Sequence, residues 1–152
     1  MGAVVITSMG LFLLLRGTKE KTSFPSVTGI ITYLDKTHAQ RPMRRDVKHR
    51  YLSLDSYSKT FEVFIGKDPG DFSPAFERLD DLQPGDEVTA YFDEDPKEKY
   101  SELNLLLQFL DKSGEPYYIR GNKDKYGGIF FIGFGIVLAI SFFLLKKAGS
   151  II

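Results

Sequence analysis

Cysteine is absent from this chain of 152 residues, and histidine occurs only twice, at His38 and His49. Without cysteine there are no disulfides, no thiolate metal sites and no cysteine nucleophile. No spacing of serine, histidine and acidic residues suggests a catalytic arrangement, and nothing near either histidine favours a catalytic or metal-binding role. The sequence therefore predicts no catalytic residue, no metal site and no cofactor.

Net charge is absent too, because 20 Lys and Arg balance 20 Asp and Glu. All 20 acidic residues and 18 of the basic ones lie between two uncharged ends, which leaves that middle part at about −2. A near-neutral domain has no general attraction to phosphate backbones. Nucleic acid is therefore not an expected partner of the chain as a whole.

The chain is rich in long apolar runs instead. Gly127 to Leu145 contains no charged residue and is closed by Lys146 and Lys147. A helix of this length reaches nearly across the ~30 Å hydrocarbon core of a bilayer. The run predicts a transmembrane helix over residues 126–147, followed by a tail at 148–152, in a plasma or inner membrane.

A second uncharged run, Gly2 to Leu15, is stopped by Arg16. As a helix it would cover about 21 Å, which is short for a span. Three interpretations compete. A cleaved signal peptide lacks support, because only Met1 precedes the run and no small-residue cleavage motif follows it. A core segment of a soluble domain would not be apolar on every side. We favour an uncleaved first transmembrane helix at residues 1–16, with a start codon that can lie further upstream.

Residues 17–125 have the composition of an extramembrane globular domain and the alternation that is typical of β-strands. Strands are expected at 26–34, 49–56, 60–66, 86–94, 103–111 and 116–121. Between the third and fourth strands, Ser73 to Leu82 predicts one short helix, because Ser73 suits its N-cap and Pro74 its first turn. Short polar joints to the apolar ends would keep this domain beside the membrane.

These elements favour a small closed or nearly closed antiparallel barrel of the OB or SH3-like kind. About six strands in about 100 residues would leave two bare edges in an open sheet, and closure removes them. A two-layer α+β arrangement is the alternative.

The stretches TGIITYLDK, RYLSLDSYSKTFEVF and LQPGDEVTAYFDEDPKEKYSELN, between Thr28 and Asn104, resemble a family of uncharacterised bacterial membrane proteins. That family is known only as a domain of unknown function, with a small β domain next to one or two transmembrane helices. The residues that carry the resemblance are Gly29, Gly85, Asp86, Val88, Tyr91 and Pro96. Glu94 stands where the family has an earlier proline. The resemblance implies the architecture described above and no activity.

One segment concentrates positive charge. His38 to Arg50 holds the candidate binding residues Arg41, Arg44, Arg45, Lys48 and Arg50. Beside a bilayer, such a loop could attract anionic lipid headgroups at about 1 kcal/mol per basic residue. Oligonucleotide binding or a mobile solvated loop are the alternatives. The acidic turn Asp93 to Asp95 lacks the ligand spacing of a calcium loop and is expected to be solvated.

Small residues recur on one face of the C-terminal run. Gly128, Gly135 and Ala139 lie near one another on a helix, and Gly135-x-x-x-Ala139 is a pair that allows another helix to approach closely. The partner could be the first run of the same chain, a second copy or another membrane protein.

The sequence as a whole favours a non-enzymatic, membrane-anchored interaction module, such as an accessory subunit or scaffold of a membrane complex. The alternatives are a lipid or nucleic-acid sensor acting through residues 38–50 and, with less support, a membrane-bound hydrolase.

With two spans, both termini lie on one side and the β domain on the other. Six basic residues near the joints favour a cytoplasmic β domain against the two at the C-terminus, but a loop of ~110 residues exceeds the range of that rule.

Overall fold

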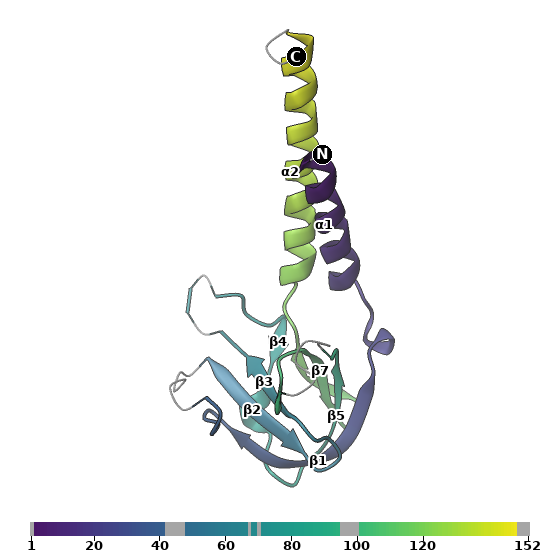
Figure 1. Ribbon diagram of the computed structural model, residues 1–152. Coiled ribbons are helices and arrows are strands. Elements are labelled where there is room, and N and C mark those ends of the chain that lie inside the picture. The colour runs from purple at the N-terminus through teal and green to yellow at the C-terminus, as the bar shows by residue number, and fades with distance from the viewer. Residues whose placement is uncertain (1, 42–47, 67, 70, 95–100, 149–152) are drawn as a thin grey trace. The chain divides into compact units, whose positions relative to one another are not determined.

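The computed structural model describes residues 2–41, 48–66, 68–69, 71–94 and 101–148 (Figure 1). The chain divides into two compact units. One consists of Met1–Lys19 with Asn122–Ile152, and the other is Glu20–Gly121. The first unit is helical and the second is a β domain.

The helical unit contains α1 (Gly2–Gly17) and α2 (Lys123–Lys147), which run side by side in opposite directions (Figure 1). Charged residues occur only near the ends of the two helices, because the uncharged runs of the sequence form their interiors. The hydroxyls of Thr7 and Ser141 each donate a 2.9 Å hydrogen bond to the carbonyl four residues earlier, so neither needs an outside partner.

Within the part of the chain that is described, α2 alone is long and apolar enough to cross a membrane. Its 25 residues correspond to about 37 Å, whereas the 16 residues of α1 correspond to about 24 Å. The expected C-terminal span therefore corresponds to α2. The expected first span corresponds to a helix that is apolar but shorter than a bilayer core.

The β domain holds a mixed sheet with eight strands among the described residues. After a 3₁₀ turn, η1 (Lys21–Ser23), the strands are β1 (Ser26–Asp35), β2 (His49–Leu54), β3 (Thr60–Phe64), β4 (Phe76–Glu77), β5 (Glu87–Phe92), β6 (Leu103–Asn104), β7 (Leu107–Lys112) and β8 (Glu115–Ile119). Their order is β4-β8-β7-β5-β1-β2-β3-β6. The neighbours are antiparallel except for β3 and β6, which are parallel.

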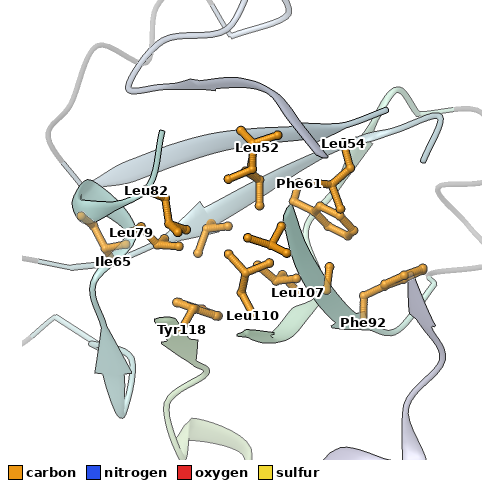
Figure 2. Close-up of a cluster of buried hydrophobic side chains, with 14 residues drawn as sticks. Leu52, Leu54, Phe61, Ile65, Leu79, Leu82, Phe92, Leu107, Leu110 and Tyr118 are labelled. Atoms are coloured by element: carbon orange, nitrogen blue, oxygen red, sulfur yellow. The ribbon is translucent and has the colours of Figure 1, made fainter. Parts of the chain in front are cut away.

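The long strand β1 joins two halves of the sheet. Its first residues, Ser26 to Ile30, pair with β5, and its later residues pair with β2, with an irregular register between Ile31 and Tyr33. The two halves face each other across one hydrophobic core (Figure 2). Strands β2, β3 and β5 contribute alternate residues to that core, as the period of two requires. Its members include Leu52, Phe61, Val63, Val88, Leu110 and Tyr118, all at most 4% exposed.

The expected closed barrel is not found, because the sheet is open, with β4 and β6 at its edges. The strand expected at 103–111 is interrupted after Asn104. Its side-chain oxygen accepts the Leu106 N–H at 2.8 Å, and its amide donates to the Tyr57 hydroxyl at 2.9 Å and to the Asp93 carbonyl at 3.2 Å. These bonds end the β6 ladder after two residues, and the chain then moves from β3 to β5. The expected single strand at 103–111 is therefore two strands.

The expected helix at Ser73 to Leu82 is wrong. This segment forms β4 and a 3₁₀ turn, η2 (Leu79–Asp81). The N–H of Ala75 donates to the carbonyl of Ile119 at 2.9 Å, and that of Arg78 to Tyr117 at 2.8 Å, so the segment pairs with the free edge of β8. An isolated ten-residue helix is marginal, and the edge strand also lets Leu79 and Leu82 enter the core. The α+β alternative fails with this helix.

Candidate functional site

The basic segment is engaged in ion pairs wherever it is described. Arg41 Nε lies 3.4 Å from Glu62 Oε2, and Lys48 Nζ lies 2.6 Å from Asp68 Oδ2 and 3.1 Å from Asp71 Oδ2. The hydrogen bonds that Lys48 donates to Asp68 and Asp71 raise its pKa above the ordinary value. Arg44 and Arg45 lie outside the described residues.

Arg50 does not belong to a surface at all. It lies on the core side of β2 and is 2% exposed. Its Nε and Nη2 donate to the two carboxylate oxygens of Asp80 at 2.5 and 2.7 Å, and its Nη1 donates to the carbonyl of His49. The bonds to Asp80 raise the pKa of the guanidinium. Arg50 therefore joins β2 to the η2 turn and is a structural residue.

The two histidines lie on the opposite face of the same part of the sheet. The His38 ring stacks on Tyr51, with the centroids 5.3 Å apart, and His49 Nε2 lies 3.7 Å from Glu62 Oε1. Glu62 is 5% exposed and also faces Arg41. Among the residues that are described, no group of three or more His, Asp or Glu is arranged to hold a metal ion.

The acidic groups considered in the loops serve local structure. Asp93 contributes backbone groups to the bonds around Asn104, and Glu94 Oε1 accepts the Tyr57 hydroxyl at 3.3 Å. Asp81 pairs with Arg78 at 2.9 Å. Asp95 lies outside the described residues. The carboxylates of Glu94 and Asp81 thus accept hydrogen bonds from donors of the same domain.

The described residues behind the family resemblance also have structural tasks. A Cβ at Gly29 would lie 2.0 Å from the Ser56 hydroxyl and 2.6 Å from the Asp55 carboxylate, so a larger residue would have to displace both side chains. Gly85 has a φ of 100°, which the turn before β5 requires. Asp86 accepts the Gln83 N–H at 3.0 Å and Lys112 Nζ at 2.7 Å, and both contacts lower its pKa. Val88 is in the core, Tyr91 lies on the other face of β5, and Pro96 is outside the described residues.

The predicted helix-packing residues are brought together. Gly128 and Gly135 of α2 are buried against α1. A Cβ on Gly128 would lie 2.7 Å from the Gly10 carbonyl oxygen, and a Cβ on Gly10 would lie 2.7 Å from the Ile132 nitrogen. Backbone therefore meets backbone at this crossing, which any side chain would prevent.

Sequence reasoning missed the partners on α1. Ala3, Thr7, Gly10, Leu14 and Gly17 follow one another at steps of four and three residues, and each lies against α2. This spacing is the heptad pattern of a left-handed helix pair, and it is readable in the sequence. At the base of the pair, Arg16 Nε lies 3.6 Å from Asp124 Oδ2.

A groove on the surface of the helix pair is the candidate binding site. It has a volume of ≈ 260 Å³ and is lined by Ala3, Val4, Thr7, Ser8, Gly135, Ile136 and Ala139. Most of these side chains are small, and the Thr7 hydroxyl already bonds to the Ala3 carbonyl. The groove is therefore apolar and shallow, and it lacks the converging polar groups that position a substrate.

The comparisons with known proteins add no relative, since no family model, no curated protein and no solved structure matches this chain.

Proposed function

We propose that the protein is a non-enzymatic membrane anchor and interaction module. In this proposal α1 and α2 cross the plasma or inner membrane as a closely packed hairpin that holds the β domain at the membrane surface. The groove between the helices receives a helix of another membrane protein, for which this chain acts as an accessory subunit or scaffold.

Exposure of α2 supports the membrane assignment. Only 11% of its most apolar 18-residue stretch is buried, and Phe130, Val137, Phe142 and Phe143 are each more than half exposed. The core helix of a soluble domain would bury most of such a surface. Hydrocarbon is the solvent that this surface matches.

The groove is the observation that carries the partner assignment. Helices in lipid associate by close packing, so small residues mark the places where another helix can approach. Ala139 of α2 and Ala3 and Ser8 of α1 provide such a surface beside Gly135, which α1 already covers. A role as a lipid or nucleic-acid sensor has less support, because carboxylates of the same domain already pair with Arg41, Lys48 and Arg50.

Photo-crosslinking in native membranes tests the proposal. A photoreactive phenylalanine analogue at Ile136, which lines the groove, is compared with the same analogue at Val137, which is 59% exposed and does not line it. We expect one discrete adduct from position 136 and none from 137. Ala139→Leu fills the groove and should abolish the adduct. Equal adducts from both positions, or none from either, would contradict the proposal, and an adduct of twice the chain's mass would identify a second copy as the occupant.

A further inference from the structure

Two exposed phenylalanines of the β domain lie on the segment before η2. The side chains of Phe72 and Phe76 are 66% and 37% exposed. The nearby carboxylates of Asp68 and Asp71 are paired with Lys48. One lysine thus neutralises one of the two negative charges beside this aromatic surface.

This segment packs against the last residue of the β domain, after which the chain continues to α2. Within the β domain, Gly121 packs against the backbone of Ser73 and Pro74, and the Ala75 N–H donates to the Ile119 carbonyl at 2.9 Å. Gly121 is only two residues before Lys123, where α2 begins. Two residues extend at most about 7 Å.

Phe76 also ends a row of paired residues that crosses five strands. Ser26 pairs with Tyr91, Tyr91 with Phe109, Phe109 with Ile119, and Ile119 with Phe76. The row begins at the first residue of β1 and includes the last residue of β8. It therefore marks the rim of the β domain at which the chain arrives from α1 and leaves for α2.

The position of this rim relative to the bilayer follows from the first residues of α2. The first four residues of α2, Lys123 to Tyr126, precede the uncharged run and rise by about 6 Å. A bilayer carries about 5–7 Å of headgroup region outside each face of its hydrocarbon core. With the uncharged run in the core, these four residues occupy the headgroup region, and Gly121 lies at its outer boundary.

We propose that Phe72 and Phe76 enter the headgroup region, so that the β domain docks on the bilayer by its aromatic rim. This inference rests on the proposed membrane anchoring. Aromatic side chains are favoured at this depth, where an apolar ring is partly shielded from water. Docking fixes one orientation of the β domain instead of leaving it to rotate on its two joints.

Tryptophan fluorescence tests the docking directly, because the chain contains no tryptophan. Phe72→Trp in the full chain is reconstituted in phosphatidylcholine vesicles that carry nitroxide quenchers either near the headgroup or at the acyl-chain ends. Ile30→Trp is the matched control on the β domain, since Ile30 is 44% exposed and lies four residues along β1 from the rim. Phe130→Trp in α2 controls for membrane insertion.

We expect Phe72→Trp to show blue-shifted emission and to lose most of its intensity to the shallow quencher, while Ile30→Trp stays unquenched. If Phe130→Trp is quenched and Phe72→Trp is quenched no more than Ile30→Trp, the docking is refuted and the membrane anchor stands. If Phe130→Trp is not quenched by either lipid, the membrane anchor itself fails, and the docking fails with it.

Discussion

At the scale of single residues, Arg50 shows how a charge can be held inside this domain. A guanidinium that is 2% exposed must form ion pairs or hydrogen bonds, since an unpaired buried charge is costly. Asp80 provides two of these bonds and remains half exposed itself. The neighbouring Asp81 forms an equivalent pair with Arg78, but both of those side chains are half exposed. The two aspartates therefore give a matched comparison.

Asp80→Asn should destabilise the β domain much more than Asp81→Asn. Loss of the charged partner of buried Arg50 should cost about 1.5–3 kcal/mol, whereas an exposed pair contributes about 0–1 kcal/mol. Urea denaturation of the two variants measures the difference. Equal and small effects would show that Arg50 does not depend on Asp80.

Tyr118 is a second residue with a measurable consequence. Burial raises the pKa of its hydroxyl to about 12, because the charged form loses its hydration. Folding thus favours the neutral form. The resulting contribution to the free energy of unfolding is fully present below the unfolded pKa of about 10. It is lost as the pH rises from about 10 to about 12, since the unfolded chain ionises first.

Tyr118→Phe should therefore reduce the loss of stability at alkaline pH. At pH 11, one unit above the unfolded pKa, ionisation of Tyr118 lowers the parent's free energy of unfolding by about 1.4 kcal/mol. The Tyr118→Phe variant should not show this loss. Urea denaturation at pH 8 and pH 11 measures it, with Tyr117→Phe on the other face of β8 as the control. An identical pH dependence in Tyr118→Phe and the parent would contradict the assignment.

At the scale of elements, alternation in the sequence located five strands because alternate residues face one core. Strands β1, β2, β3, β5 and β8 lie within two residues of their expected bounds at both ends. The error at 73–82 arises where the backbone pairs with a strand distant in the sequence, and the error at 103–111 arises where the Asn104 side chain bonds to other parts of the chain. Neither the pairing of Ala75 with Ile119 nor the bonds of Asn104 leave a periodic pattern. At 73–82, propensity alone favoured a helix where the chain forms an edge strand and a 3₁₀ turn.

The contacts of some candidate residues could be predicted from the sequence, and those of others could not. Gly128 and Gly135 were predictable because close helix packing requires small residues at a fixed spacing. The ion pairs of Arg41, Lys48 and Arg50 could not be predicted, because their acidic partners, Glu62, Asp68 and Asp80, are distant in the sequence. Charge density along a chain shows nothing of such pairing.

Gly128→Ala should weaken the helix pair, whereas Gly133→Ala should not. An added Cβ at Gly128 meets backbone atoms of α1 that cannot yield, and overpacking of this kind costs about 1–3 kcal/mol. A Cβ at Gly133 meets nothing within 4 Å, and alanine should gain about 0.4–1 kcal/mol as the better helix former.

The readout is maleimide cross-linking between Arg16→Cys and Asp124→Cys in the cysteine-free chain, followed through an SDS titration in detergent micelles. The SDS concentration at which half of the cross-linking is lost should fall for Gly128→Ala and should stay the same or rise for Gly133→Ala. Equal midpoints in both variants would argue against the close contact of α1 and α2.

At the scale of the whole molecule, the β domain has its own core and its own complete set of strands. Glu20–Gly121 should therefore fold without the helices, since about 100 residues bury enough surface for a stable domain. We expect a β-type circular dichroism spectrum and a cooperative urea transition. A helix-rich or non-cooperative result would show that the helical unit is needed for folding.

The central claim is that both helices cross the membrane and that the β domain lies on one side of it. Labelling of single cysteines by an impermeant maleimide in intact cells tests this most directly. One cysteine is placed in a tag before Met1, one replaces Glu115 in the β domain, and one is placed in a tag after Ile152. The account predicts that the two terminal cysteines report the same side and Glu115→Cys the opposite side. Labelling of the N-terminal tag on the same side as Glu115→Cys would contradict it.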